Sequence, residues 1–201
     1  MKEWWWITIT NQEKLIETAH EDAANQILNT DYGAHYLIVY PDLYALRKFY
    51  THCIKQQIKE KNDIVLVNPF YETTDSVRKT LSDGNAGIDV PKYEKEQSLI
   101  IIDSLEEYFG EKNDMDFKRD IANYAKEKGK KGLLVLGDIS AYPYKGRHSD
   151  LVDYELSLPT TYDDIAMKGF CLYHEKDFNR FSEEDRQKLI NHHGMAIKIK
   201  A

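Results

Sequence analysis

Short apolar runs recur along this chain, and each is joined to the next by a stretch with the residue spacing of a helix. The runs read HYLIVY (35–40), IVLV (64–67), LIII (99–102), LLVL (133–136) and FCLY (170–173). Strands that are apolar at consecutive positions are covered on both faces, as in the parallel sheets of α/β proteins. Because strands alternate with helices, right-handed crossovers are expected. The pattern therefore predicts a three-layer α/β fold, with a mainly parallel sheet and helices on both faces.

Element boundaries follow from the apolar spacing, the capping residues and the Gly and Pro breaks. Further strands are expected over 195–199 and over 1–10, where MKEWWWITIT forms a strand or arm. Helices are expected over 12–28, 41–58, 75–81, 113–129, 151–158 and 182–194. Residues 92–97 are expected to form a solvated loop, and residues 137–150 a longer loop that is either a binding lid or a mobile surface connection. The chain of 201 residues shows no linker, which predicts one domain over 1–201, with 1–30 as an N-terminal strand or arm plus a helix.

Composition indicates the cellular compartment and the kinds of partner that are expected. Lys and Arg number 27 against 34 Asp and Glu, a formal net charge of -7 that repels a phosphate backbone, so no direct nucleic-acid partner is expected. No apolar run reaches the roughly 20 residues of a membrane span, and no signal peptide is recognisable. The two cysteines, Cys53 and Cys171, have no zinc or redox spacing, which favours ordinary packing in a reducing compartment. We therefore expect a cytoplasmic protein without a membrane anchor.

Polar and aromatic residues follow the carboxyl ends of the predicted strands, which is where ligands bind in open α/β sheets. Any single one of them is more often a helix cap or a core residue, so only their clustering favours a binding site. The set comprises Tyr40, Asp42, Asn68, Tyr71, Glu72, Asp103, Ser104, Asp138, Tyr142, Tyr144, Tyr173 and His174.

The remaining histidines and carboxylates form no catalytic or metal motif. His35 either contacts a ligand or, more often for a histidine beside an apolar run, is a hydrogen-bonded structural residue. His192 and His193 lie near the end of a predicted helix, where they are expected to offset the helix dipole rather than to bind a metal. No Ser-His-Asp order, GxSxG turn or paired-carboxylate spacing occurs. We expect no catalytic residue, no metal and no cofactor.

Three consecutive tryptophans, Trp4, Trp5 and Trp6, stand near the N-terminus. Alternate side chains of a strand point to opposite faces, so the three cannot all pack in one core. At least one is expected to contact a partner, a neighbouring subunit or a covering helix.

The segment SLIIIDSLEEYF (98–109) resembles the core strand of RecA-type ATPases, particularly the clock protein KaiC, in which an apolar strand ends in the Walker B aspartate. Asp103 stands at that position. The segment YPDLYALRKFY (40–50), where the phosphate-binding loop would lie, has neither the glycines nor the Lys-Ser/Thr pair of that loop. Without glycines the backbone cannot wrap a phosphate chain. The resemblance implies a RecA/KaiC-like fold with a degenerate phosphate-binding loop.

This combination is similar to the MEDS family, the methanogen/methylotroph DcmR sensory domain, over about residues 32–199. The matching pieces are His35 with Tyr40, resembling the family's H-x4-Y strand, Gly137-Asp138, Tyr154-Glu155, and FCLYHEKDF (170–178), resembling its closing C-x-Y-D segment. Two positions depart from the family: His174 stands where an acid is usual, and the residues before Tyr40 lack the usual cysteine. These departures bear on the identity of the ligand.

The resemblance implies a sensory domain of archaeal or bacterial type that binds a small hydrocarbon-derived or other metabolite and is not an enzyme. No transcription or kinase output domain is recognised, so signalling is expected through a partner protein, such as a kinase or transcription regulator, or through a homo-oligomer. Aromatic walls with a few polar anchors suit small-molecule recognition. The expected ligand-binding residues are His35, Tyr40, Asp103, Asp138, Tyr154, Glu155 and Tyr173.

Two other functions are compatible with the sequence. In a residual nucleotide binder, Asp103 or Asp138 would hold Mg²⁺, and Lys48 or Arg147 would replace the missing lysine. In a structural or docking module, the Trp4–Trp6 arm and the sheet edge would form an oligomer interface. The absent glycines argue against the first, and the second is compatible with sensing.

Overall fold

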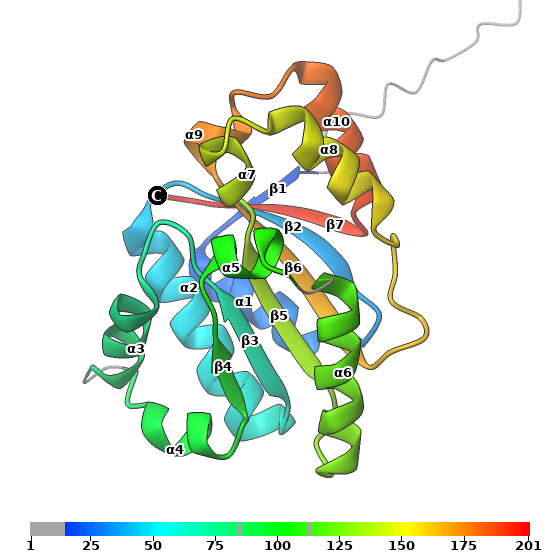
Figure 1. Cartoon of the computed structure of the whole chain (residues 1–201). Helices are drawn as coiled ribbons and strands as arrows, with labels where there is room; N and C mark the ends of the chain where they lie inside the picture. Colours follow the sequence, from blue (N-terminus) through cyan, green and yellow to red (C-terminus); the bar gives the residue numbers. More distant parts are fainter. Residues whose placement is uncertain (1–14, 84–85, 112–113) are drawn as a thin grey trace, which may run out of the picture.

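The computed structural model describes residues 15–83, 86–111 and 114–201. In these residues seven strands form one sheet in the order β1-β7-β2-β6-β5-β3-β4, and each neighbouring pair is parallel (Figure 1). The predicted parallel α/β sheet is thus confirmed. The strands are β1 (Leu15–Thr18), β2 (His35–Tyr40), β3 (Ile64–Asn68), β4 (Leu99–Ile101), β5 (Leu133–Asp138), β6 (Met167–His174) and β7 (Met195–Ile199).

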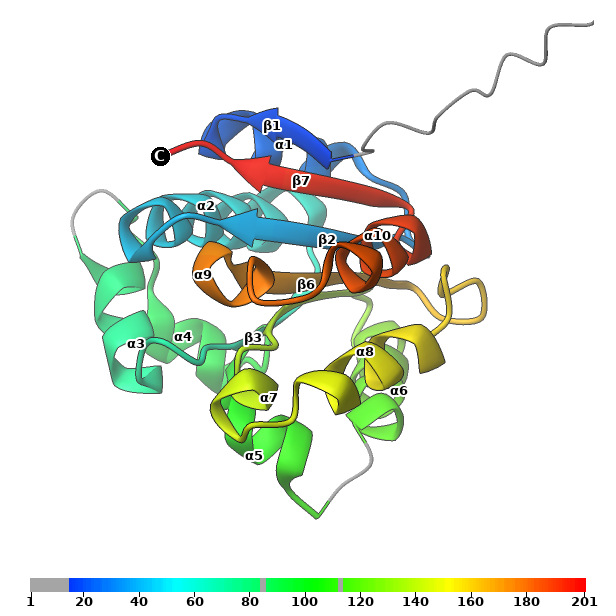
Figure 2. The same ribbon diagram turned by 90° about the horizontal axis from the view of Figure 1, so that it is seen from above.

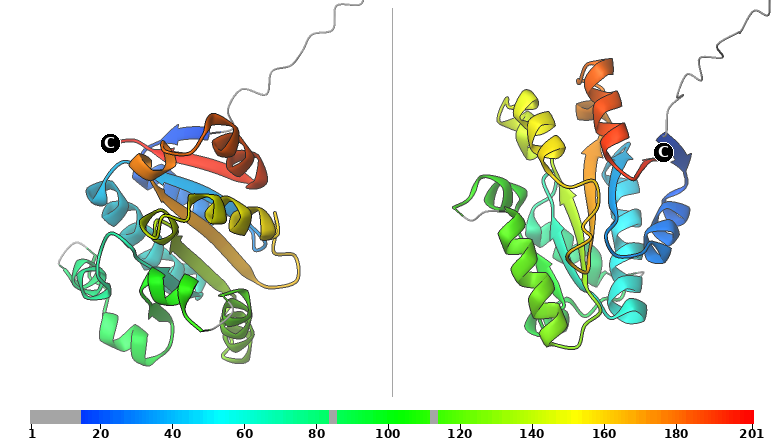
Figure 3. Two further views of the ribbon diagram at one scale, coloured as in Figure 1. Left: turned by 45° about the horizontal axis from the view of Figure 1, so that its top comes forward. Right: turned by 90° about the vertical axis from the view of Figure 1, so that its right-hand side faces the viewer.

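Helices cover both faces of the sheet, which makes the three predicted layers, as Figure 2 shows from above. One face is packed by α1 (His20–Asn29), α2 (Leu43–Gln56) with the π-helical turn η1 (Gln57–Lys61), α3 (Thr74–Ser82) and α4 (Val90–Lys95). The other face carries α5 (Ser104–Phe109), α6 (Asp114–Glu127), α7 (Ala141–Tyr144), α8 (His148–Ser157), α9 (Glu175–Phe178) and α10 (Glu183–His192). The right-hand view of Figure 3 shows α6, α8 and α10 on one side of the strands and α1 and α2 on the other.

Strand β2 shows how the sheet sorts its side chains between the two faces. Successive residues of a strand point to opposite faces. Ile38 and Tyr40 join the core under α1 and α2, whereas Leu37 and Val39 join the core under α8 and α10. His35 has the same parity as Leu37, so its side chain lies on the face covered by α8 and α10, where it is fully buried.

The predicted helix over 12–28 is wrong at its start, because Leu15–Thr18 form strand β1 and the helix begins only at His20. Strand β1 pairs with β7 in the register Leu15↔Ala196 to Thr18↔Ile199. The free backbone edge of β7 supplies hydrogen-bond partners along the segment, and this tertiary pairing outweighs the helical spacing of the apolar residues. The expected strand or arm over 1–10, with Trp4–Trp6, lies outside the described residues.

Two predicted loops contain helices. Residues 92–97 overlap α4, in which the Asp89 side chain accepts a hydrogen bond from the Lys92 backbone N–H at 3.2 Å and Pro91 lies in the first turn, both favourable at a helix start. In the stretch 137–150, Gly137 and Asp138 continue β5, α7 follows at Ala141, and α8 begins at His148. The short helices α5 and α9 were not predicted either, because four to six residues carry too little periodicity.

The longest α-helices of the described residues, α2 and α6, have 14 residues each. A membrane span needs about 20 apolar residues. No described helix is long and apolar enough to cross a membrane.

Candidate functional site

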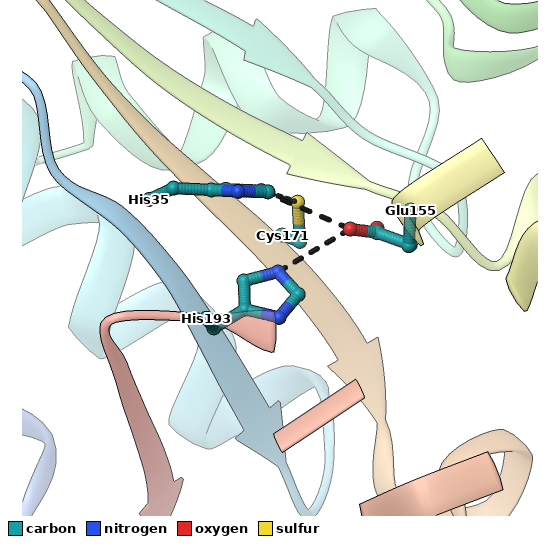
Figure 4. A group of neighbouring side chains, drawn as sticks. All are labelled: His35, Glu155, Cys171 and His193. Carbon is teal, nitrogen blue, oxygen red and sulfur yellow. Dashed lines mark hydrogen bonds and ion pairs between the residues drawn. The ribbon is translucent and has the colours of Figure 1, made fainter. Parts of the chain in front are cut away.

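Four side chains from distant parts of the chain meet on the face of the sheet covered by α8 and α10. His35 begins β2, Glu155 projects from α8, Cys171 lies within β6, and His193 is the C-cap residue directly after α10 (Figure 4). Each offers one ligand-type atom, and these four atoms all lie within 4.8 Å of one another. We call this group the four-residue cluster.

The sheet register brings the cluster together. In the pairing of β2 with β6, His35 lies opposite Gly169 and Leu37 lies opposite Cys171, so His35 and Cys171 share one face. His193 reaches the same place because the backbone N–H of the next residue, Gly194, donates to the His35 carbonyl at 2.9 Å. Gly169 is required at its position: a Cβ there would lie 2.8 Å from the ring of Tyr162, which packs against His35 with ring centroids 5.2 Å apart.

Hydrogen bonds orient both imidazole rings of the cluster. His35 Nδ1 lies 2.9 Å from the Pro159 carbonyl oxygen, and His193 Nδ1 lies 2.7 Å from the Leu189 carbonyl oxygen. A carbonyl only accepts, so Nδ1 donates in both rings. Each Nε2 faces the cluster: His35 Nε2 lies 3.4 Å from Cys171 Sγ and 3.8 Å from Glu155 Oε2, and His193 Nε2 lies 3.3 Å from Glu155 Oε2.

Burial and mutual charge set the protonation states. Burial, followed by the charge of His193, lowers the pKa of His35 to about 4, so this ring is neutral at physiological pH. Burial opposes ionisation of Glu155, but the close contact with His193 and its charge bring the pKa of Glu155 below its usual value. Burial and the Glu155 charge hold the pKa of the Cys171 thiol well above its usual range. Both Glu155 oxygens and His193 Nε2 lack a hydrogen-bond partner, although the two side chains form an ion pair.

A second polar group lies at the carboxyl edge of the sheet. The Tyr40 hydroxyl donates to Asp138 Oδ2 at 2.7 Å, across the end of β6, and the Ser140 backbone N–H donates to Asp138 Oδ1 at 3.0 Å. Burial raises the pKa of Asp138 to about 6. The enclosed space beside Asp138 and Asn68 is about 10 Å³, room for about one water molecule. This space is therefore too small for a metabolite.

A third group ties α8 to α5 and α6. The Tyr154 hydroxyl donates to Asp114, and the buried Lys118 ammonium pairs with Asp114 and, at 3.7 Å, with Glu107. Tyr154 immediately precedes Glu155 in α8. This lysine group therefore fixes the helix that carries the cluster carboxylate.

Comparison with known proteins places the chain in a family. A model of the methanogen/methylotroph DcmR sensory domain, MEDS, matches residues 34–194. The chain belongs to the MEDS family. No curated protein matches it. All four cluster residues fall inside the matched segment, and the family is described as sensory, which points away from catalysis.

The structure divides the seven ligand residues expected in this MEDS domain among separate places. His35 and Glu155 lie in the cluster, and Tyr173, fully buried on the same face, has an unpartnered hydroxyl. Tyr154 belongs to the lysine group. Tyr40 and Asp138 pair at the carboxyl edge, and Asp103 caps α5 by accepting from the Leu105 backbone N–H at 2.8 Å.

Sequence reasoning missed Cys171 and His193 as members of the site. His193 does lie at a helix end, as expected, where it bonds a helix carbonyl, but its other nitrogen is buried against Glu155. Cys171 was treated as ordinary packing because its spacing fits no metal motif. The one available signal was its place in FCLYHEKDF, a segment that resembles the family pattern.

Proposed function

We propose that this chain is a sensory domain that binds a small ligand at the four-residue cluster and passes the change to a partner protein or to a second copy, without hydrolysing nucleotides. The observation that carries the proposal is the cluster itself, in which four ligand-type atoms lie within 4.8 Å of one another between the sheet and two covering helices. Of these side chains, the Glu155 carboxylate oxygens and His193 Nε2 are buried without a hydrogen-bond partner. Unsatisfied buried polar atoms are costly and concentrate at functional sites. Membership of a sensory family supports the regulatory role.

Helices α8 and α10 are the route by which a change at the cluster would reach the surface. Glu155 projects from α8, His193 is the C-cap residue of α10, and the two helices contact each other. Both pack on β2, β6 and β7 through one apolar core. Packed helices shift as units rather than deforming continuously, so a ligand that changes the Glu155–His193 distance would move both. Their outer surfaces would meet a kinase, a transcription regulator or another copy of the chain.

Addition of ATP or ADP with Mg²⁺ is expected to leave the melting temperature unchanged. Only two residues separate the end of β2 from the start of α2. The N-terminus of α2, where a phosphate would bind, is capped by the Asp42 carboxylate, which accepts from the Ala45 N–H at 2.9 Å. A ligand that binds only the native state would raise the melting temperature in a thermal-shift titration. A nucleotide-specific increase that Asp103→Ala abolishes would instead favour the nucleotide-binding alternative.

Glu155→Gln is expected to speed hydrogen exchange in α8 and α10 by about tenfold or more, which corresponds to about 1.4 kcal/mol of lost local stability. Glutamine keeps the shape of the side chain but removes the charge that pairs with His193. Mass spectrometry of peptides from α8, α10 and α6 would measure the effect, with α6 expected to change least.

Glu184→Gln is the matched control, because Glu184 lies on α10 but its side chain is 79% exposed and pairs with Lys188 at the surface. Exposed pairs contribute less than about 1 kcal/mol, so this variant should exchange like the wild type. Equal exchange in both variants would mean that the cluster does not control α8 and α10, and would contradict the proposed route of signalling.

A further inference from the structure

The two histidines of the four-residue cluster are oriented as metal ligands are. In each ring Nδ1 donates to a backbone carbonyl, of Pro159 for His35 and of Leu189 for His193. A neutral imidazole with hydrogen on Nδ1 has a bare lone pair on Nε2. Metal-bound histidines characteristically donate their other N–H to a carbonyl or carboxylate, which fixes both the tautomer and the ring orientation. Here both lone pairs point into the same buried space (Figure 4).

Three of the six separations between the ligand atoms are close to the edges of a coordination tetrahedron, and all six are within 4.8 Å. Metal–ligand bonds of about 2.0–2.3 Å, as zinc forms to His, carboxylate and Cys, place neighbouring ligand atoms about 3.3–3.7 Å apart in tetrahedral geometry. The observed separations are 3.3 Å from His193 Nε2 to Glu155 Oε2, 3.4 Å from His35 Nε2 to Cys171 Sγ, and 3.8 Å from His35 Nε2 to Glu155 Oε2. Only small side-chain shifts are needed to close the site around an ion.

We propose that His35, Glu155, Cys171 and His193 bind one Zn²⁺ ion with tetrahedral coordination. Two imidazole nitrogens, a thiolate and a carboxylate form a donor set that suits zinc rather than the oxygen-preferring Mg²⁺ or Ca²⁺. The thiolate and the carboxylate together carry two negative charges, which balance the ion once the thiol proton is released on binding. The sequence, which predicted no metal, carries no zinc spacing because the ligands come from four separate elements.

An ion pair without a metal joins the four side chains only two by two. A protonated His193 would form an ion pair with Glu155 Oε2 at 3.3 Å, and the Cys171 thiol would donate a hydrogen bond to His35 Nε2 at 3.4 Å. The cluster would then consist of two separate pairs, with nothing joining the imidazole of His35 to that of His193. A metal ion uses both lone-pair nitrogens and neutralises the carboxylate, so it accounts for all four side chains.

The zinc site deepens the proposed function and rests on it, because it names the ligand at the same cluster. Four protein ligands close the coordination shell and leave no open position for a substrate, as in non-catalytic zinc sites. The ion would join α8 to the end of α10 and to strands β2 and β6. Binding and release of zinc would then be the change that those helices transmit.

The test is titration of the full chain, freed of metal with a chelator, with Co²⁺ as the spectroscopic substitute for zinc. We expect one Co²⁺ per chain, visible absorption bands of tetrahedral Co²⁺, a near-ultraviolet thiolate-to-cobalt band, and displacement of all three by Zn²⁺. His193→Gln should weaken binding by more than about 100-fold, since even a lost supporting hydrogen bond costs about 10- to 100-fold. Cys171→Ala should abolish the thiolate band.

The chain offers matched controls for both variants. His192→Gln alters the neighbouring histidine, which is not in the cluster. Cys53→Ala alters the other cysteine, which lies on α2 and is buried in the core. Both should bind Co²⁺ like the wild type. Circular dichroism would confirm folding, and if His193→Gln does not fold, Cys171→Ala decides the point alone. Failure of the folded wild type to bind Co²⁺, or equal binding by Cys171→Ala, would overturn the zinc site.

Hydrogen exchange of α8 and α10 with and without Zn²⁺ separates the zinc site from the proposed sensing. Tight binding with slower exchange in these helices supports both. Tight binding with unchanged exchange supports the zinc site and overturns signalling through α8 and α10. Absence of binding, together with a metabolite that slows exchange in α8 and α10, overturns the zinc site and leaves the sensory function standing.

Discussion

Replacement of Lys118 by methionine is expected to lower the free energy of unfolding by about 3 kcal/mol. The ammonium is buried and pairs with Asp114 and, at 3.7 Å, with Glu107. Methionine fills much of the same space but carries no charge. The substitution therefore leaves two largely buried carboxyl groups without a cation, which costs more than loss of a pair at the surface.

Protonation determines how the loss depends on pH. Burial and the hydrogen bond to Asp114 raise the pKa of Glu107 to about 8, so one proton is held between the two carboxyl groups at neutral pH. Burial opposes ionisation of Asp114, but Lys118 and the hydrogen bond from Glu107 keep the pKa of Asp114 below its usual value. One negative charge therefore remains when Lys118 is removed. A second proton neutralises this remaining charge. The loss in free energy of unfolding caused by Lys118→Met should therefore become smaller as the pH falls from 8 to about 5.

Urea unfolding followed by circular dichroism at the two pH values would measure this loss. Lys188→Met is the matched control, because Lys188 forms its pairs with Glu184 and Asp185 on the exposed surface of α10. Its expected loss is below about 1 kcal/mol. If the two variants lose the same small amount, the Lys118 group does not hold α5, α6 and α8 together.

Asp138→Asn is expected to change the pH dependence of stability by about 3 kcal/mol between pH 4 and 7. Burial raises the pKa of Asp138 from 3.8 to about 6. Below pH 4 the carboxyl is protonated in both the folded and the unfolded chain and costs nothing. As the pH rises through this interval the unfolded chain loses the proton first, so folding requires proton uptake and stability falls. Above pH 6 both states are ionised and the penalty is constant.

Asparagine removes the charge but keeps a carbonyl oxygen for the Ser140 N–H, and its amide can donate to the Tyr40 hydroxyl oxygen. The free energy of unfolding of the variant should therefore rise relative to that of the wild type by about 3 kcal/mol from pH 4 to pH 7. Urea unfolding at several pH values would measure this difference. Asp120→Asn, an exposed substitution on α6, should follow the wild type throughout. A constant difference between Asp138→Asn and the wild type would show that Asp138 ionises normally and that the carboxyl edge is wetter than its burial indicates.

The sequence by itself determined the type of fold and most of its elements. Runs such as LIVY (37–40) and LLVL (133–136) are apolar or aromatic at every position and are buried throughout, as in a strand covered on both faces. The starts of two helices are also determined by nearby residues. The side chains of Asp42 and Ser182 cap α2 and α10, as the sequence indicates. Local spacing failed for Leu15–Thr18, whose strand exists only because β7 offers an edge.

The grouping of the candidate site was decided by the tertiary structure alone. His35 and Cys171 are separated by 136 positions and meet because β2 lies beside β6 in the sheet. His193 joins them because β7 lies on the other side of β2, and Glu155 because α8 covers that face. Residue spacing encodes which face of its own element a side chain occupies, but it does not encode which strand lies next to which. The strand order, set by burial of the whole core, therefore brought these four residues together and left Asp103 as a helix cap.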